Sequence, residues 1–214
     1  MGAVEYTSAP PGASMTRERG IRPARRLLAV LVWTGLLAMP RGASATGPPA
    51  VPPELQAAIF SRVLAFDRAL KDRVGKTVTI GIVFNGSNEE SKQVKQRMTR
   101  AFLDVQKDIQ DLPCRISSHD YHDMSHLASW IDASEVDVLY VTDGLEVFLD
   151  DIKAVAYEKR VATLTPVRGY VERGLAIGVV AKGNRPQLVV NLPATKAAGM
   201  DLDPKALQLS EVIR

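Results

Sequence analysis

All three histidines of the chain lie within eight residues, at His119, His122 and His126. Between them stand Asp120, Tyr121 and Asp123. Two imidazoles four residues apart on a helix face the same side, and with a carboxylate they could bind zinc or copper. No fourth ligand is evident elsewhere in the sequence, and a helix capped by Asp120 or Asp123 explains the same residues. We therefore predict no metal site, and metal binding by the trio stays the alternative.

Hydrolytic chemistry has less support in the sequence. There is no Gly-x-Ser-x-Gly elbow, and any catalytic triad would need one of the clustered histidines. On an extended strand Cys114 would lie about 16 Å from His119, too far for a thiol–imidazole pair. Both the Gly-x-Gly-x-x-Gly motif and the P-loop are absent. The sequence therefore predicts a protein that is not an enzyme and holds no cofactor.

The elements that must position these residues alternate between strand and helix. Apolar runs predict strands at 77–84, 112–117, 136–141 and 161–164. Because these strands are apolar on both faces, we expect a parallel sheet with helices on both sides. The last two long strands, 175–181 and 187–191, are joined by a tight turn. The predicted fold is a single-domain, three-layer α/β/α structure with a mainly parallel sheet and a C-terminal β-hairpin.

Apolar residues at helical spacing predict three long helices. Pro52 and Pro53 suit the start of the first, and Gly75 suits its end. Its predicted buried face consists of Leu55, Ile59, Val63, Phe66 and Leu70. The second helix has the same spacing in Val94, Met98, Phe102, Val105 and Ile109. The third, at 145–159, is expected to turn Val147, Ile152 and Val155 inward. A shorter helix is expected at 124–131.

Two loops are candidates for ligand binding. In an open α/β sheet, ligands lie beyond the carboxyl ends of the strands, where the strand order reverses. A flavodoxin-like order places this point after the first and third strands, where the chain reads Asn-Gly-Ser at 85–87 and Thr-Asp-Gly at 142–144. The first loop precedes a helix whose free amides could hold an anion. The candidate residues are Asn85, Ser87, Thr142 and Asp143, and an ordinary turn with a helix cap is the alternative.

A third candidate is the segment 165–174, which follows the fourth strand. We expect the chain to turn over the sheet edge there and to expose two arginines, a tyrosine and a glutamate. Tyrosine and arginine are the side chains that most often anchor protein interfaces. Arg168, Tyr170 and Arg173 are therefore candidate partner-binding residues. The alternative is a rim loop in which Tyr170 is buried as local core.

The N-terminus has the order of a secretory signal. A basic stretch at 17–26 precedes an apolar run at 27–39, and Ala43-Ser44-Ala45 offers a cleavage site. That run rises only about 20 Å as a helix, short of the roughly 30 Å hydrocarbon core. We predict a signal peptide at 1–45 that is cleaved after Ala45, a Pro/Gly/Ala-rich tether at 46–53 and one domain at 54–214. An uncleaved anchor is the alternative, and translation could start at Met1 or Met15.

Charge and cysteine content narrow the class of partner. Residues 1–45 hold six arginines and two acids, so the totals of 27 basic and 24 acidic residues leave 21 and 22 in the rest of the chain. A nearly neutral domain does not attract phosphate backbones, so we expect no nucleic acid as partner. Cys114 is the only cysteine and is either buried or paired between the chains of a homodimer. Its place at the start of an apolar strand favours burial.

The last 47 residues carry a family resemblance. The residues concerned are Tyr170, Gly174, Asn191, Leu192, Ala197, Ala198, Gly199, Leu207, Leu209, Val212 and Ile213. In this pattern the segment resembles the C-terminal half of the YfiR-like family of exported regulatory proteins. The resemblance implies a periplasmic, non-enzymatic protein that binds the periplasmic part of an inner-membrane signalling protein, such as a diguanylate cyclase or a sensor kinase, and inhibits it.

The same ending also resembles one lobe of transporter solute-binding proteins. That resemblance implies a small-molecule ligand as the alternative function. Solute-binding proteins need two lobes with a cleft between them, and the predicted mature chain is long enough for one. Its length therefore favours the regulator.

Overall fold

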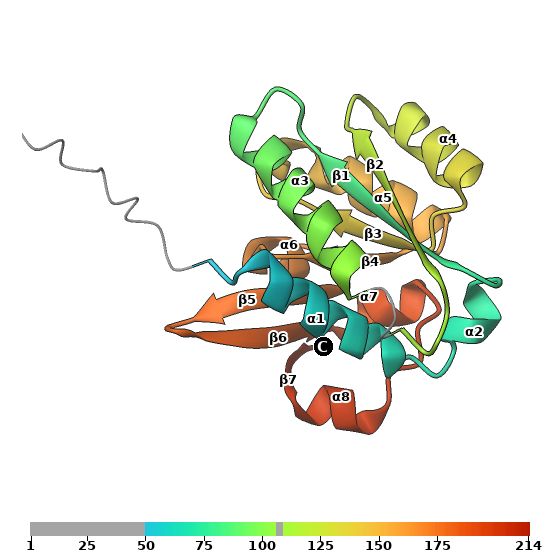
Figure 1. Ribbon diagram of the computed structural model, residues 1–214, viewed down its shortest axis with the longest axis vertical. Helices are drawn as coiled ribbons and strands as arrows, with labels where there is room; N and C mark the ends of the chain where they lie inside the picture. Colours follow the sequence, from blue (N-terminus) through green and yellow to red (C-terminus); the bar gives the residue numbers. More distant parts are fainter. Residues whose placement is uncertain (1–49, 106–108) are drawn as a thin grey trace, which may run out of the picture. The chain divides into compact units, whose positions relative to one another are not determined.

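The computed structural model of the chain describes residues 50–105 and 109–214 (Figure 1). The predicted signal peptide and residues 46–49 of the tether lie outside the described residues. The strands are β1 (Val78–Phe84), β2 (Cys114–Asp120), β3 (Val138–Val141), β4 (Ala162–Thr165), β5 (Ile177–Lys182), β6 (Arg185–Asn191) and β7 (Ser210–Ile213). They form one sheet in the order β2-β1-β3-β4-β5-β6-β7. All neighbours are parallel except β5 and β6, which form the predicted hairpin.

Helices cover both faces of this sheet. One face packs against α1 (Pro53–Ala65), α3 (Glu89–Asp104) and α7 (Leu192–Ala197), and α1 and α3 lie on its near side in Figure 1. The other face packs against α4 (Met124–Ser134), α5 (Leu149–Glu158) and α6 (Arg168–Glu172). The shorter turns are α2 (Leu70–Arg73), α8 (Pro204–Gln208) and the 3-10 turn η2 (Glu146–Phe148). The three-layer α/β/α prediction is confirmed. Within the described ranges, no helix is both long and apolar enough to cross a membrane.

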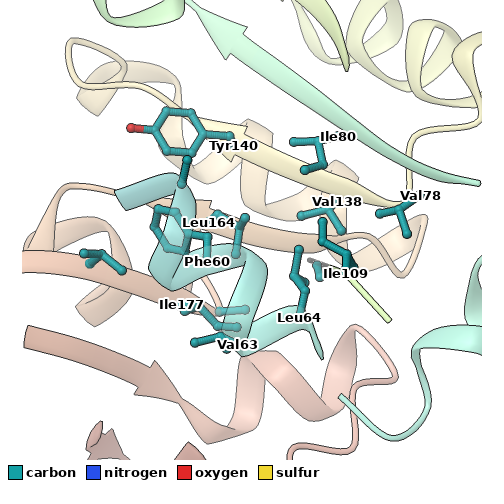
Figure 2. Close-up of a cluster of buried hydrophobic side chains, with 14 of the residues drawn as sticks. Phe60, Val63, Leu64, Val78, Ile80, Ile109, Val138, Tyr140, Leu164 and Ile177 are labelled. Atoms are coloured by element: carbon teal, nitrogen blue, oxygen red, sulfur yellow. The ribbon is translucent and has the colours of Figure 1, made fainter. Parts of the chain in front are cut away.

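The core under α1 and α3 is built around Tyr140 (Figure 2). Its ring meets Phe60 and Phe102 edge-on, with ring centroids 5.9 and 5.8 Å apart. The buried Tyr140 hydroxyl donates to Gln56 Oε1 at 2.9 Å, and Gln56 Nε2 donates to the Val51 carbonyl at 2.7 Å. Val51 is itself buried. The last residues of the predicted tether therefore pack as part of the fold.

The first helix ends earlier than its apolar spacing predicts. It stops at Ala65 and turns a different face inward, so that Leu55 is 40% exposed whereas Ala57, Phe60 and Leu64 are fully buried. A continuous helix to Gly75 is therefore wrong. The break occurs around Asp67, a fully buried carboxylate that needs hydrogen-bond donors which a regular helix would not supply.

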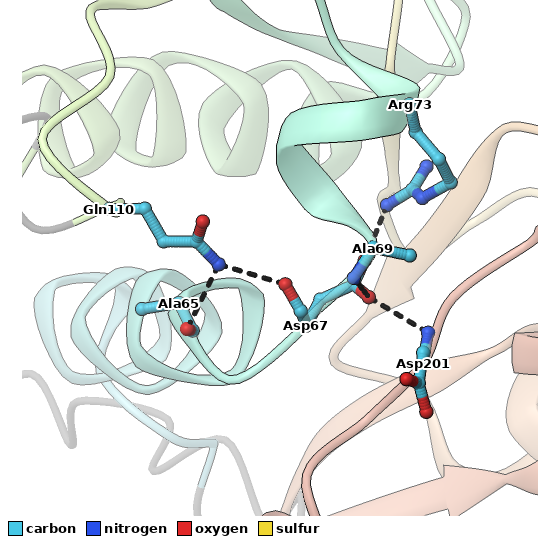
Figure 3. Close-up of polar contacts among 6 residues, drawn as sticks. All are labelled: Ala65, Asp67, Ala69, Arg73, Gln110 and Asp201. Carbon is cyan, nitrogen blue, oxygen red and sulfur yellow. Dashed lines mark hydrogen bonds and ion pairs between the residues drawn. The ribbon is translucent and has the colours of Figure 1, made fainter.

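The chain around this break supplies those donors (Figure 3). Asp67 Oδ1 accepts from the backbone amides of Ala69 at 3.1 Å and Asp201 at 2.8 Å. Arg73 donates to Asp67 Oδ2 at 2.7 Å. Gln110 Nε2 adds bonds to the carbonyls of Ala65 and Asp67, at 3.1 and 2.8 Å. Segments more than a hundred residues apart in sequence are thus joined by one buried charge. We call Asp67 and its partners the Asp67 cluster, which consists of Ala65, Asp67, Ala69, Arg73, Gln110 and Asp201.

Two further boundaries differ from prediction. Helix α3 ends at Asp104, and Ile109 is buried outside it rather than on its last turn. Strand β2 continues to Asp120, three residues beyond the predicted end, because it pairs with β1 over its whole length up to Phe84. This extension places His119 on a strand.

Candidate functional site

The loops at 85–87 and 142–144 were predicted to meet at the switch point, the place where the strand order reverses, and they do meet. Strand β1 lies between β2 and β3, as the flavodoxin-like order requires. Asn85 Nδ2 donates to the Gly144 carbonyl at 3.0 Å, and the hydroxyls of Ser91 and Thr142 lie 2.7 Å apart. The structure therefore joins the two loops at the carboxyl ends of β1 and β3.

Two of the four residues predicted to bind a ligand at these loops form hydrogen bonds within the protein instead. Asn85 Oδ1 accepts from the Ser87 amide at 3.0 Å. The fully buried Thr142 donates to the Val83 carbonyl at 3.1 Å. The helix N-terminus is capped by Asn88, which accepts from the Ser91 amide at 3.1 Å. Asn85 and Thr142 thus fasten the loops to each other, whereas Ser87 and Asp143 are exposed.

The cavity between these loops is acidic. Its volume is about 240 Å³, and its charged lining consists of Glu90, Asp143 and Glu146. Partial burial raises the pKa of Asp143, and a hydrogen bond with Glu146 adds to the rise. Carboxylates repel an anion, so this cavity does not offer the anion site that the helix amides suggested. A cationic or neutral group suits it better.

The segment 165–174 is not the exposed turn that we predicted. Residues 168–172 form helix α6, and Tyr170 is 2% exposed. Its hydroxyl accepts from the buried Leu145 amide at 2.9 Å, and burial raises the pKa of the Tyr170 phenol. The exposed position predicted for Tyr170 is wrong, and the alternative of a locally buried side chain is the one observed. A buried backbone amide needs an acceptor, which explains why the ring points inward.

The two arginines of this segment are exposed and point to different neighbours. Arg168 pairs with Glu172 on its own helix and with Glu211 on β7. Arg173 donates to the Glu146 carbonyl and to Asp150 Oδ2, both at 3.0 Å. Of the two, only Arg173 therefore reaches the loop after β3. Tyr170 and Arg173 thus connect the segment 168–174 to Leu145 and Glu146 in the loop after β3.

Val147 follows Glu146 in η2 and was predicted to point inward. It is 84% exposed, more than any other large apolar side chain in the described residues. Helical spacing failed because α5 begins only at Leu149, after the 3-10 turn η2 has rotated Val147 outward. We call Val147 and its charged neighbours Asp143, Glu146, Asp150 and Arg173 the carboxyl-edge surface. No apolar motif in the sequence marks it.

The rings of the three histidines are farther apart in this structure than a shared zinc ion would hold them. The ring centroids of His119 and His122 are 6.4 Å apart, and those of His122 and His126 are 6.3 Å apart. A tetrahedral zinc ion with bonds of about 2.0–2.1 Å would hold them about 5 Å apart. Asp123 instead caps α4 by accepting from the His126 amide at 3.0 Å. In the described part of the chain, no group of three His, Cys, Asp or Glu residues could hold a metal ion.

The sequence of this chain matches one known protein family. The profile of the YfiR/HmsC-like family matches residues 54–211. The chain belongs to the YfiR/HmsC-like family. No curated protein matches it. Family membership supports, in general terms, a periplasmic regulator of signalling proteins.

Two solved structures share the fold of this YfiR/HmsC-like protein. A conserved domain protein from Vibrio cholerae O1 biovar El Tor is similar to it with a TM-score of 0.59 and 14% identity, over 78% of this chain and 62% of that one. The ABC domain from Streptococcus pneumonia in complex with L-Trp gives a TM-score of 0.57 and 14% identity, over 76% and 60%. The chain spans about three-fifths of the length of each. At this identity the likeness shows the fold alone.

The lone thiol of this YfiR/HmsC-like protein lies at the edge of the sheet. Cys114 begins β2 and is half-buried, packed against the core under α1 and α3. Burial raises the pKa of its thiol to about 11. Because the thiolate is the reactive form, we expect Cys114 to react slowly with thiol reagents at neutral pH.

Proposed function

We propose that this protein binds the periplasmic part of an inner-membrane signalling protein, such as a diguanylate cyclase or a sensor kinase, and holds it inactive. Membership in the YfiR/HmsC-like family supports the general role. The place of contact that we propose is the carboxyl-edge surface. The observation that carries this choice is Val147, whose side chain is 84% exposed and which lies within four residues of Asp143, Glu146 and Asp150 in sequence.

The charges of this surface define the chemistry of the partner. Asp143, Glu146 and Asp150 are exposed and lie within four residues of Val147 in sequence, and Arg173 is already paired with Asp150. A small apolar centre with a polar rim is the usual arrangement of an interface anchor. The complementary surface would therefore present an apolar side chain or pocket flanked by lysines or arginines. Positive charge on the partner would also speed its association at low salt.

The loop that carries Val147 is held in place before any partner arrives. Tyr170 fixes the Leu145 amide, Arg173 fixes the Glu146 carbonyl, and Asn85 fixes the Gly144 carbonyl. A pre-ordered loop loses little conformational entropy on binding, so a small contact area can still give useful affinity. This is why we favour this surface over Leu209, which is 77% exposed but follows a five-residue helix near the chain end.

A small-molecule ligand at the switch point is the second candidate. The cavity there measures about 240 Å³. Ligand pockets are typically about 300–1,000 Å³ and mostly apolar. A small cavity lined by three carboxylates is therefore a weaker basis for function than the exposed Val147.

Site-specific cross-linking tests the proposal. A photo-reactive amino acid replaces Val147 in one variant and Leu209 in the matched control, since both side chains are exposed. After irradiation of cells, we expect the Val147 variant to be joined to an inner-membrane signalling protein and the Leu209 variant not to be. Absence of such a product at position 147, or equal yields from both positions, would contradict the proposal.

Export is part of the same proposal, because the partner lies outside the cytoplasm. We propose that the segment 1–45 acts as the export signal and that the mature protein begins at Thr46. Sequencing the N-terminus of the protein from the cell envelope tests this point. Full-length protein found in the cytosol would contradict it.

A further inference from the structure

The histidine cluster lies beside the carboxyl-edge surface and has an unusual packing of its own. The ring of His119 on β2 stacks on Trp130 of α4, with ring centroids 4.9 Å apart and planes at 18°. The indole of Trp130 occupies the space over Gly81 of β1, where a Cβ atom would lie only 2.5 Å from it. Gly81, Trp130 and His119 thus form a stack that holds α4 against β1 and β2.

One atom in this stack has no hydrogen-bond partner. His119 Nε2 is buried and makes no hydrogen bond within the described part of the chain. The groups that face His119 are Asp120 on its own strand, His122 and Asp123 in the following loop, and His126 on α4. A proton added to His119 would place a charge among two other imidazoles, in a site with no acceptor at Nε2. Such a charge destabilises the packed arrangement.

The end of β2 contacts residues that adjoin the carboxyl-edge surface in sequence. Asp120 accepts from the Gly86 amide at 2.6 Å, and the Tyr121 amide donates to the Phe84 carbonyl at 2.9 Å. The Tyr121 ring lies 4.8 Å from that of Phe148, the residue after Val147. Its hydroxyl donates to Asp151 of α5 at 3.0 Å. A displacement of residues 119–121 would therefore reach η2.

We propose that the histidine cluster makes the carboxyl-edge surface responsive to acid. Protonation of His119 loosens the segment 119–130, and with it the Tyr121–Phe148 contact that supports Val147. The effect on partner binding rests on the proposed function, whereas the structural response belongs to this protein alone. In an exported protein, such a device would report the pH outside the cytoplasm.

The direction of the response follows from the charges. Burial lowers the pKa of His119, repulsion from His122 and His126 lowers it further, and Asp120 and Asp123 oppose the change. In the unfolded chain the pKa would be about 6.5. Because the folded state binds its proton less readily, the stack is at full strength above this value. It weakens as the pH falls toward the lower pKa of the folded form.

Histidine NMR and hydrogen exchange test the structural part on the purified protein. The chain has three histidines, so single substitutions assign their ring signals. We expect His119 to titrate at the lowest pH, and the protection factors of Tyr121 and Phe148 to fall about tenfold between pH 7.5 and 5.5 as the proton is bound. His119→Phe keeps a stacked ring without a titrating group and should remove this pH dependence. His122→Gln should raise the pKa of His119 by removing repulsion, which gives a second test if His119→Phe folds poorly.

Cross-linking through position 147 at the two pH values separates this inference from the proposed function. We expect a yield about tenfold lower at pH 5.5 than at pH 7.5, and no difference in the His119→Phe background. No cross-link at either pH would overturn the proposed function, while the NMR result would still decide the structural response. Equal yields at both pH values, or protection that does not change with pH, would overturn the inference.

Discussion

The two ends of the parallel strands differ in how they use charged residues. At the edge where the strands begin, Asp67 is fully buried, and Arg73 pairs with it. Arg73 also lines a cavity with Asp137, the residue before β3, which places the Asp67 cluster at this edge. At the other end, where the strands finish, Asp143, Glu146 and Asp150 are exposed within four residues of Val147 in sequence. A buried charge is tolerated only with its partners supplied, so the first edge should determine stability and the second should determine binding.

The largest effect should come from Asp67→Ala. Removing one partner of a buried pair leaves Arg73 without its carboxylate, and such changes cost about 3–5 kcal/mol. Urea unfolding should show this loss, while binding through Val147 should fall only as folded protein is lost.

Arg68→Ala is the matched control for Asp67. Arg68 forms an ion pair with Asp201 at 2.8 Å in the same region, but both side chains are more than half exposed. Exposed pairs contribute about 0–1 kcal/mol. If the two variants had equal stability, the burial of Asp67 would not have the importance that we assign to it.

The next largest effect is expected for Tyr170, which lies near the proposed binding surface but should contribute to stability as a core residue does. Tyr170→Phe removes the hydroxyl that accepts from the Leu145 amide and leaves that amide buried without a partner. The expected cost is about 1–3 kcal/mol in thermal unfolding. Binding should also weaken, because the loop that carries Val147 is then less well held. A variant with unchanged stability would show that the Leu145 amide has another acceptor.

Val147→Ala should show the opposite separation. The side chain is almost fully exposed, so the free energy of unfolding should change by no more than about ±0.5 kcal/mol. The melting temperature should therefore stay nearly the same. Affinity for the partner should fall by roughly 1–2 kcal/mol, the scale of an interface anchor. Titration of the partner's periplasmic domain measures it, with Leu209→Ala as the matched control. If the variant lost more stability than affinity, Val147 would contribute to packing rather than to binding.

The alternation of strands with helices and the final hairpin could be predicted from the sequence because both depend on local patterns, whereas the flavodoxin-like strand order was assumed by analogy. Runs of β-branched and apolar residues mark buried strands, and their alternation with helices leaves few topologies. The meeting of the loops after β1 and β3 followed from that topology. The structure extends these predictions only at element ends, as at Asp120 of β2.

Two of the errors have one physical origin, which is that a side chain's direction depends on contacts distant in sequence, and the third concerns where a helix starts. The break at Asp67 depends on an amide 134 residues away at Asp201. Tyr170 is buried because the Leu145 amide, 25 residues earlier, needs an acceptor. Val147 points outward because the helix begins two residues after it, and helical spacing cannot show where a helix starts. The core was therefore easier to predict than the surface that we propose for binding.

Arg168→Ala and Arg173→Ala should also change stability little, and the difference between their effects on binding sharpens the comparison. Both guanidinium groups are exposed and paired with carboxylates, so each loss should cost about 0–1 kcal/mol of stability. Arg168 pairs with Glu211 of β7, away from the loop after β3. Arg173 holds the Glu146 carbonyl next to Val147 at 3.0 Å. We therefore expect Arg173→Ala to weaken partner binding severalfold and Arg168→Ala to leave it unchanged, in one titration series at fixed salt. Equal weakening by both would mean that the contact extends along α6 toward β7, whereas no weakening by either would confine it to Val147 and its acidic neighbours.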